Sequence, residues 1–319
     1  MKLEFTEKVM GSFQPAKVIS SNNATITSID FDDSGQKCVT SNVDDSLDFW
    51  DSGSGKHEKT TYSKKYGCKL ARFTHSPNSC IYASTKEDHA LRYLDYKTGS
   101  YLRYMRGHKA SVVSLEINPV NDSAISSSVD GTVRIWDLKA PNSVGLLEIS
   151  PSSPLLATVD ATGLVFAVAS KAHNTISLHD MRNYEGKPFL TFRCDAPGNW
   201  TKLEFSNDGK NVLVVTDSNC HVVYNSFTGS LLTTLKGFQP LPMGTTSQAA
   251  FSMDGRYVYG ATSNKGVAVW NLRNCNGVEL QPWARFEAKQ EPSVIAFSPR
   301  MMMMATAHTA LTLWLPTSI

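Results

Sequence analysis

Hydrophobic and polar residues alternate in short runs along this chain, and the runs are separated by polar turns. The first clear run is Ile26-Thr27-Ser28-Ile29-Asp30-Phe31, followed by the turn-forming residues Asp32-Asp33-Ser34-Gly35. A period of two residues is typical of a β-strand with one face in a core, and Asp, Ser and Gly are favoured in tight turns. A further segment, Leu47-Asp48-Phe49-Trp50-Asp51, has the same character. The pattern therefore predicts an all-β chain of short strands.

One unit of this pattern is complete between Gly107 and Asp137 and recurs, with losses, along the whole sequence. The position of its tryptophan is occupied in turn by Trp50, Leu94, Trp136, His179, Tyr224, Trp270 and Trp314. Successive positions are 44, 42, 43, 45, 46 and 44 residues apart. A period of about 40 to 45 residues is that of a propeller blade. We therefore expect seven blades in a single closed domain over residues 1–319.

The complete unit resembles a WD repeat, which implies a four-stranded blade in a WD40 β-propeller. In this resemblance His108, Ser126 or Ser128, Asp130 and Trp136 correspond to the structural tetrad of the family. The carboxylate would orient the imidazole, which would bond a hydroxyl and then the indole N–H. We therefore interpret His108 as a structural strut. The alternative is a catalytic or metal-binding histidine, but no second His, Cys or carboxylate stands at ligand spacing beside it.

Residues 13–20 form a predicted strand that contains Pro15 and precedes the first full repeat. Proline is tolerated at a sheet edge, because its missing N–H then faces solvent. The last repeat ends soon after Trp314 without an outermost strand. We expect the N-terminal strand to complete blade seven and close the ring, which leaves no open edge. The predicted blades span residues of about 26–62, 68–106, 112–149, 155–194, 200–237, 247–285 and 293–316.

Two segments that look unusual also fit the repeat. In blade four, His173 replaces the turn aspartate and His179 replaces the tryptophan. A metal site is the alternative, but each histidine occupies a structural position of the repeat. In blade seven, Met301 to Met304 lead the predicted second strand. We expect these methionines to fill the core, since neighbouring blades cover both faces of the strand.

Composition narrows the function classes. Hydrophobic residues make up 41% of the chain, yet no apolar run reaches the ~18 residues of a membrane span. Acidic residues in the N-terminal segment argue against a secretory signal. The six cysteines include no C-x-x-C pair, so we expect free thiols in a reducing compartment. The net charge of +2 predicts no strong attraction to nucleic acid. A soluble protein that binds other proteins fits these features.

The resemblance narrows below the WD repeat in several segments. They are Tyr62-Ser63-Lys64-Lys65-Tyr66-Gly67, Ile81-Tyr82-Ala83-Ser84-Thr85, Arg92-Tyr93-Leu94, Tyr101-Leu102-Arg103-Tyr104, Asn118-Pro119-Val120-Asn121-Asp122, Gly163-Leu164-Val165-Phe166-Ala167 and Lys202-Leu203-Glu204-Phe205-Ser206. These segments resemble the family of the fungal Swd-two proteins and the animal WD-repeat protein eighty-two, and the resemblance covers essentially the whole chain. It implies a nuclear scaffold subunit that is not an enzyme and has no cofactor.

The resemblance implies one of two complexes, which differ in their partners. The first is the phosphatase module of the cleavage and polyadenylation factor, in which a PNUTS-like scaffold joins the propeller to a type-one protein phosphatase. Its roles are transcription termination and mRNA 3′-end processing. The second is COMPASS, whose partner is a SET-domain histone methyltransferase. Both act on transcribing RNA polymerase II, and the animal relative is also linked to its phosphorylated C-terminal domain. The residues do not decide between them, and we place the first complex ahead of the second.

One candidate binding segment lies in a loop on the face that carries the tight turns. Lys64 and Lys65 place two cations beside Tyr66, which suits an acidic or phosphorylated peptide. The alternative is an ordinary solvated loop.

A second candidate is the loop that contains Phe238, Leu241 and Met243. It is richer in apolar side chains than solvation favours, and these side chains could form a docking patch for a linear peptide. Alternatively, they pack under the rim of the propeller.

Other function classes leave only partial signals. The turn Gly53-Ser54-Gly55-Lys56 lacks the upstream glycine of a phosphate-binding loop, and Asp-Gly pairs stand at turns, where bonding to the backbone explains them. A substrate receptor of a cullin ubiquitin ligase often carries Trp-Asp-x-Arg. Trp136-Asp137-Leu138-Lys139 and Trp270-Asn271-Leu272-Arg273 each differ from it at one position. We predict no catalytic, cofactor or metal site, and no direct binding of nucleic acid or membrane.

Overall fold

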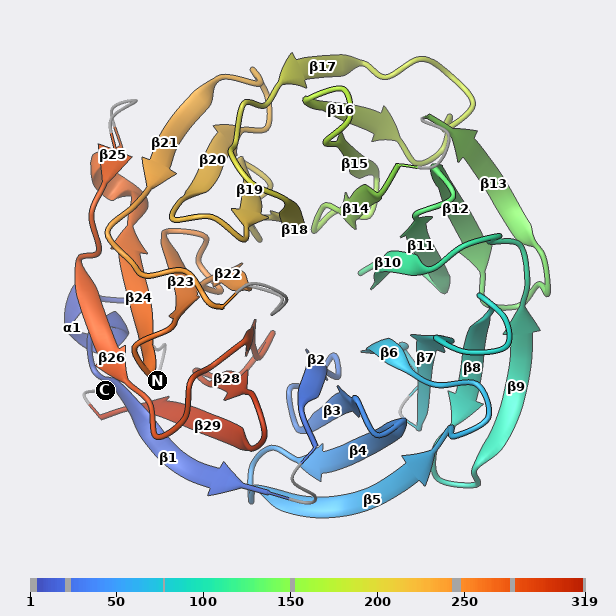
Figure 1. Ribbon diagram of the computed structural model, residues 1–319, viewed down its shortest axis with the longest axis horizontal. Coiled ribbons are helices and arrows are strands. Elements are labelled where there is room, and N and C mark those ends of the chain that lie inside the picture. Colours follow the sequence, from blue (N-terminus) through green and yellow to red (C-terminus); the bar gives the residue numbers. More distant parts are fainter. Residues whose placement is uncertain are drawn as a thin grey trace.

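Seven sheets surround a central axis in the computed structural model, which describes residues 5–20, 24–76, 78–149, 153–242, 248–275 and 279–317 (Figure 1). Within a sheet, the strands follow one another along the chain from the axis outward, except in the blade that joins the two ends of the chain. The structure confirms the predicted all-β, seven-bladed propeller.

The strands of each blade are short and antiparallel. Blades one to three contain β2 (Ile26–Phe31), β3 (Lys37–Asn42), β4 (Ser46–Asp51), β5 (Lys56–Tyr62), β6 (Lys69–Phe73), β7 (Ser79–Ala83), β8 (Leu91–Asp95), β9 (Ser100–Met105), β10 (Val112–Ile117), β11 (Ser123–Ser128), β12 (Thr132–Asp137) and β13 (Ser143–Glu148). Blades four and five contain β14 (Leu155–Val159), β15 (Val165–Ser170), β16 (Thr175–Asp180), β17 (Leu190–Arg193), β18 (Trp200–Phe205), β19 (Asn211–Thr216), β20 (His221–Asn225) and β21 (Leu231–Leu235). Blades six and seven contain β22 (Ala249–Phe251), β23 (Tyr257–Thr262), β24 (Gly266–Asn271), β26 (Ala284–Glu287), β27 (Val294–Phe297), β28 (Met304–Ala307) and β29 (Leu311–Pro316).

The two ends of the chain meet in blade seven. Strand β1 (Phe13–Ile19) pairs antiparallel with β29, with Phe13 opposite Pro316 and Ile19 opposite Leu311. A bulge follows Pro15, where the register shifts before Lys17. The N-terminal strand is therefore the outermost strand of this blade, as predicted, and its proline lies on the edge of a sheet.

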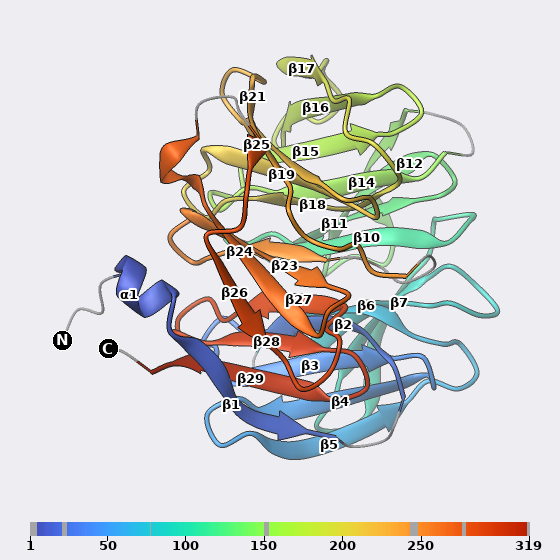
Figure 2. The same ribbon diagram turned by 60° about the vertical axis from the view of Figure 1, so that its left-hand side comes forward.

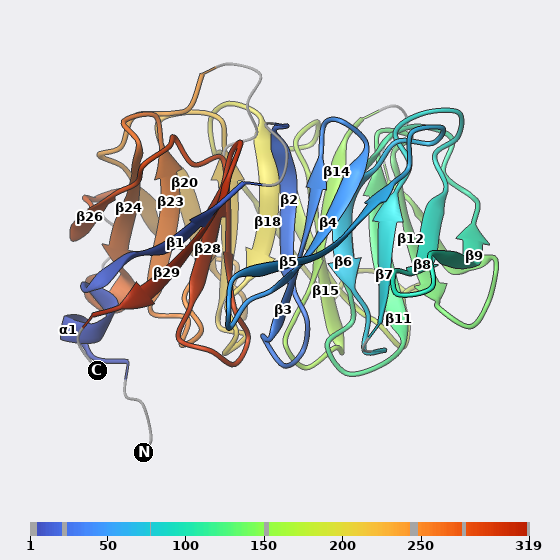
Figure 3. The ribbon, with the colours of Figure 1, turned by 90° about the horizontal axis from the view of Figure 1, so that it is seen from below.

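A short helix precedes this strand on the outside of the ring. Helix α1 (Glu7–Met10) is capped by the side chain of Thr6 and buries Val9 and Met10. Tyr259 donates a hydrogen bond of 3.0 Å from its hydroxyl to the carbonyl of Met10. Figures 2 and 3 show α1 and both chain ends at the same face, which we call the lower face. It is the longest α-helix in the described parts of the chain, and no helix there is long and apolar enough to cross a membrane.

Blade five carries a strand that the repeat pattern does not predict. Strand β25 (Glu279–Leu280) lies after the 3-10 helix η1 (Leu272–Asn274) and pairs in parallel with β21. The segment belongs to blade six in sequence, yet Leu280 accepts a hydrogen bond of 2.9 Å from the amide of Lys236. It covers part of the outer edge of blade five and ties the two blades together.

The hydrophobic core lies mainly between neighbouring blades. Trp50, Trp136, Trp270 and Trp314 are all fully buried, and Trp50 packs against Leu311 and Ala305 of blade seven. Each of these four tryptophans lies in a cluster with residues of the preceding blade, which explains why their position keeps the period of the sequence.

Polar side chains on the innermost strands also join successive blades. Asp30 on β2 accepts a hydrogen bond of 2.8 Å from the amide of Phe73, and Glu116 on β10 accepts one of 2.9 Å from the amide of Val159. The acceptor and donor are 43 residues apart in each pair. The same repeat position therefore fastens blade one to blade two and blade three to blade four.

The methionine run of blade seven lies partly outside the predicted strand. Only Met304 belongs to β28, while Met301 to Met303 form the preceding bend. Met303 and Met304 are buried, and Met301 and Met302 are half-buried against the adjoining clusters. All four contribute to packing, which agrees with the expectation that they fill the core.

Replacing Phe13 by alanine should destabilise the closure of the ring. The Phe13 side chain is 2% exposed, and its ring centroid lies 6.1 Å from those of Tyr259 and Phe297. Loss of a buried phenylalanine costs about 3–5 kcal/mol of unfolding free energy. Urea unfolding measures this loss. The control is Gln14→Ala, an exposed position on the same strand, and equal midpoints for the two variants would contradict the expectation.

Candidate functional site

The complete repeat of blade three contains a chain of buried polar contacts. The imidazole of His108 lies with Nδ1 3.1 Å from Asp130 Oδ2 and with Nε2 2.8 Å from Ser126 Oγ. The indole of Trp136 donates from Nε1 to the same Ser126 Oγ at 2.8 Å. Four side chains from the loop before β10, from β11, from the β11–β12 turn and from β12 thus satisfy one another.

Ser126, not Ser128, completes this chain. Ser128 donates from Oγ to the carbonyl of Ala110 at 2.9 Å and accepts from the amide of Asp130 at 3.1 Å. Ser128 therefore joins the β11–β12 turn to the loop before β10. Successive residues of a strand point to opposite faces, but residues 126 and 128 share a face, which is why the sequence alone left both serines open.

The electrostatics of the chain favour a neutral histidine. Burial lowers the pKa of His108 to about 4, against the opposing effect of Asp130. Burial works against ionisation of Asp130 too, but hydrogen bonds from Thr132 and from the amide of Lys109 outweigh it and lower the pKa to about 2. At neutral pH an uncharged imidazole accordingly bridges a carboxylate and a hydroxyl.

Blades one and seven keep part of this arrangement, and blade four has a variant of it. Trp50 donates to Thr40 Oγ1 at 3.2 Å, and Trp314 donates to Thr306 Oγ1 at 2.8 Å. In blade four, His179 is buried, stacks on Phe166 and lies with Nε2 2.9 Å from Ser177 Oγ. His173 lies with Nδ1 3.0 Å from Ser170 Oγ. In the described residues no group of three His, Cys, Asp or Glu side chains could hold a metal ion.

The candidate cations Lys64 and Lys65 lie in the loop between β5 and β6, and both side chains are exposed. Lys64 Nζ lies 5.2 Å from the ring centroid of Tyr62, and Lys65 Nζ lies 5.2 Å from that of Tyr66. Tyr62 is itself 56% exposed. Tyr62 at the end of β5 and the two lysines of the loop thus present an aromatic ring and two cations to solvent. They lie on the face opposite α1, which we call the upper face (Figure 3).

A buried arginine, which the sequence analysis missed, supports this loop. The Arg92 guanidinium lies 3.5 Å from the ring centroid of Tyr66 and 5.1 Å from that of Tyr104. It donates to Ser84 Oγ at 2.8 Å and to Asp88 at 2.8 Å, and its side chain is only 2% exposed. Stacking on aromatic faces and a fixed hydrogen-bond fork hold an arginine in one orientation. The signal in the sequence was a charged residue at an inward-facing strand position, two residues before Leu94.

The second candidate segment does not form an exposed patch. Phe238 and Leu241 are each 7% exposed. The ring of Phe238 lies 4.6 Å from that of His221 and 5.4 Å from that of Trp270, and Leu241 packs into the cluster between blades six and seven. The docking interpretation is therefore wrong for these two residues, because both side chains pack under the rim. Met243 lies outside the described residues.

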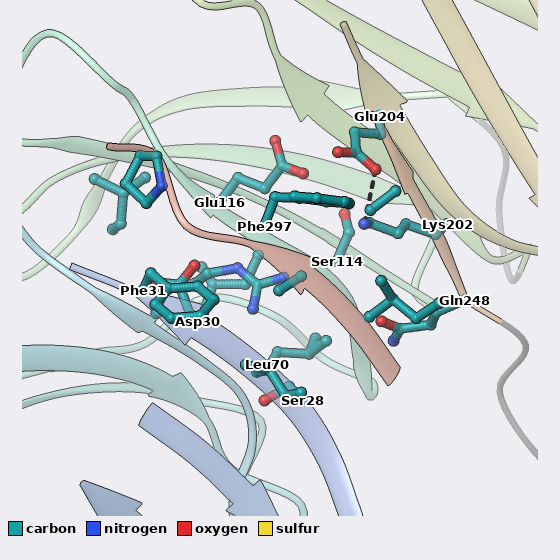
Figure 4. Close-up of a pocket in the computed structure, with 18 of the residues that line it drawn as sticks. Ser28, Asp30, Phe31, Leu70, Ser114, Glu116, Lys202, Glu204, Gln248 and Phe297 are labelled. Atoms are coloured by element: carbon teal, nitrogen blue, oxygen red, sulfur yellow. Dashed lines mark hydrogen bonds and ion pairs between the residues drawn. The ribbon is translucent and has the colours of Figure 1, made fainter. Parts of the chain in front are cut away.

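The innermost strands line a central cavity of about 370 Å³ that the sequence analysis also missed (Figure 4). Asp30, Glu116 and Glu204 face it together with Arg72 and Lys202. Lys202 forms an ion pair of 2.8 Å with Glu204. Burial raises the pKa of Asp30 to about 6, which Arg72 opposes, and raises that of Glu116 to about 7, which the hydrogen bond from Val159 opposes. Both carboxylates bond the neighbouring blade, so their role in the fold is structural.

Replacing Ser126 by alanine should destabilise blade three. The change removes the partner of both His108 Nε2 and Trp136 Nε1, and a buried donor or acceptor without a partner costs about 1–3 kcal/mol. Chemical denaturation measures the loss, and Ser123→Ala on the same strand serves as control because the Ser123 hydroxyl bonds only an exposed turn residue. Equal losses for the two variants would exclude a special role for Ser126.

Replacing Glu116 by glutamine should change how stability depends on pH. Folded Glu116 has a pKa of about 7 against 4.5 for the ordinary group, so its ionised form lowers stability at high pH. This penalty disappears as the pH falls through 7 toward 4.5. Between about pH 8 and pH 5, the unfolding free energy of the wild type should therefore rise relative to the variant, by at most about 1.4 kcal/mol per pH unit.

Urea unfolding at a series of pH values tests this expectation. Glu148→Gln, on the exposed face of β13, should give a curve parallel to that of the wild type. A parallel curve for Glu116→Gln as well would contradict the assignment.

Comparison with known proteins agrees with this architecture over the whole chain. The family model for the WD domain, G-beta repeat, matches residues 13–51 and 99–137. WD repeat-containing protein 82 of Drosophila melanogaster is 36% identical over 100% of this chain and 99% of that protein. Set1 complex component swd2 of Schizosaccharomyces pombe is 34% identical over 98% of this chain and 99% of that protein.

A third relative extends the same relationship to another yeast. COMPASS component SWD2 of Saccharomyces cerevisiae is 37% identical over 94% of this chain and 92% of that protein. The three matched regions cover between 94% and 100% of this chain. The chain belongs to the family of WD repeat-containing protein 82 and Swd2.

Proposed function

We propose that this protein is a non-catalytic scaffold subunit of a nuclear histone methyltransferase complex of the COMPASS type. The observation that carries the proposal is that two relatives, matched over more than nine-tenths of their length, are named as components of the Set1 complex and of COMPASS. Its partner in such a complex is a SET-domain methyltransferase. From sequence the polyadenylation complex is the first prediction, but the names of these relatives give COMPASS the better support.

The chemistry of the described residues supports a role in binding. His108 is a neutral strut, and the buried carboxylates Asp30 and Glu116 bond the backbone of the next blade. The polar groups at these positions thus stabilise one blade from within, in the case of His108, or join neighbouring blades, in the case of the two carboxylates. What the described chain offers to a partner is its surface, and Lys64 and Lys65 beside Tyr66 form one cationic part of it.

We infer that this segment contacts an acidic stretch of a partner protein. Two exposed ammonium groups next to each other attract carboxylates or phosphates, and nearby aromatic rings add contact area. A phosphorylated C-terminal domain of RNA polymerase II has the required charge. Contacts of this kind change association rates and salt dependence more than they change total affinity.

The phosphatase module of the cleavage and polyadenylation factor is a second candidate. An uncharacterized WD repeat-containing protein of Schizosaccharomyces pombe is 31% identical over 97% of this chain. This protein and swd2 of the same yeast each match nearly the whole chain, which is consistent with separate family members for separate complexes. In this setting the partners are a PNUTS-like scaffold and a type-one protein phosphatase. A role as cullin ligase receptor has only the incomplete Trp-Asp motifs in its favour.

Quantitative mass spectrometry of proteins that co-purify with the endogenous chain distinguishes these proposals. A SET-domain methyltransferase should be recovered in stoichiometric amounts if the COMPASS assignment holds. Recovery of polyadenylation factors and a phosphatase instead would support the second candidate. Recovery of a cullin adaptor, or of none of these proteins, would overturn both.

The same purification tests the cationic segment. A variant with Lys64→Glu and Lys65→Glu should recover an acidic partner several-fold less well, because two attractive charges become repulsive. A variant with Lys187→Glu and Lys289→Glu makes the same change of net charge at exposed positions of blade four and of the loop after blade six. Equal recovery with the two variants would show that Lys64 and Lys65 do not bind the acidic partner through their charge.

A further inference from the structure

Three turns of blades one and two are fastened together on the upper face. The amide of Ser63 bonds the carbonyl of Asp45 at 2.8 Å, which joins the β5–β6 loop to the β3–β4 turn. The carbonyl of Tyr66 accepts from the amides of Thr85 and Lys86 at 2.9 and 2.8 Å, which joins the same loop to the β7–β8 turn. The three turns therefore form one unit, which carries the side chains of Lys64, Lys65 and Lys86. We call this unit the three-turn platform.

Arg92 supports the three-turn platform from inside the blade, and the turns of the platform pack closely against one another. The stacked guanidinium of Arg92 lies under Tyr66 and bonds Asp88 of the β7–β8 turn. Gly67 has a positive φ of 68°, and an added Cβ there would lie 1.8 Å from Thr85 Oγ1. A side chain at this glycine would push the loop away from the neighbouring turn. The lysines of the platform are thus presented from a fixed backbone.

One of the three lysines of the platform already forms an ion pair with a carboxylate of the platform. Asp45 Oδ2 forms an ion pair with Lys86 Nζ. The side chain of Asp45 is 14% exposed, whereas that of Lys86 is 52% exposed. In the described parts of the chain no ion pair involves Lys64 or Lys65, whose ammonium groups lie instead near tyrosine rings. The platform therefore shows two unpaired cations and a third that an internal carboxylate neutralises.

We propose that Asp45 is a built-in competitor for acidic ligands of the three-turn platform. An acidic peptide that reaches Lys64 and Lys65 meets Lys86 on the adjacent turn, and it binds Lys86 only by replacing or sharing the Asp45 carboxylate. This inference rests on the proposed contact of Lys64 and Lys65 with an acidic partner. It adds that Asp45 limits the affinity for that partner. Asp45 restricts binding to ligands with enough negative charge to compete.

The backbone allows this idea to be tested by a conservative change. Asp45 has a left-handed φ of 67°, a conformation that asparagine adopts readily. Asp45→Asn thus keeps the turn and the amide-to-carbonyl bond to Ser63 and removes only the competing charge. Release of Lys86 from this partly exposed ion pair should tighten binding by up to about fivefold.

Fluorescence anisotropy with a fluorescein-labelled, glutamate-rich peptide gives the affinity. We expect Asp45→Asn to bind more tightly than the wild type and to lose more affinity on addition of salt, since one more cation is engaged. Asp195→Asn provides the matched control. It adds the same charge at an exposed carboxylate that pairs with Arg193 in blade four, and it should leave the affinity unchanged. An uncharged, glutamine-rich peptide should bind none of the three proteins.

Lys86→Met decides whether the effect passes through the ion pair. In the Lys86→Met background, Asp45→Asn should give less than half of its effect in the wild-type background. Equal tightening in both backgrounds, or none in the wild type, overturns the role of Asp45. If Lys64→Met still weakens peptide binding in that case, the cationic segment stands. Co-purification of the methyltransferase complex is a separate readout, so failure of the proposed function is distinguishable from failure of this inference.

Discussion

The fold depends on one requirement, which is that every blade must be covered on both faces by its neighbours. A single four-stranded blade cannot bury its apolar side chains, and only a closed ring gives each blade two partners. The fully buried tryptophans and the clusters that cross from blade to blade are the outcome of this requirement. The requirement also explains why blade seven combines the first strand of the chain with the last three.

A fold that meets this requirement tolerates large changes of residue type at individual repeat positions. Blade three has a complete polar chain through His108 and Ser126, while blade four places a histidine where the tryptophan stands. Stability in a repeat protein is approximately a sum over units and their interfaces, so a well-formed neighbour supports an irregular unit. Direct ties between blades, such as Glu116 to Val159 and β25 to β21, add to these interfaces.

Much of the fold was predictable from sequence because the period of the tryptophan position directly reflects the contact between blades. Strand closure was predictable too, since Pro15 marked an edge strand and the last repeat lacked one. Strand β25 was not, because a two-residue parallel addition leaves no alternation in the sequence. Arg92 was missed for a different reason: its partners come from the β5–β6 loop, the β7–β8 turn and β9, which only the folding of blade two brings together. Phe238 and Leu241 show the opposite error, since apolar residues in a loop indicate burial as readily as docking.

The pairing of β1 with β29 has a consequence for the order of events in the cell. Strand β29 is synthesised after all the other described strands, so β1 has no partner strand until the ribosome has added the last strand of blade seven. Contacts between residues so far apart in sequence form slowly. Until that pairing forms, β1 is an unpaired strand and the face of blade one that packs on blade seven is uncovered. Uncovered apolar faces and unpaired strands favour aggregation during folding. The amide of Thr317 bonds the carbonyl of Ser12, so the start of β1 and the end of β29 lie side by side in the finished ring. A bulky domain fused next to either strand would hinder their pairing.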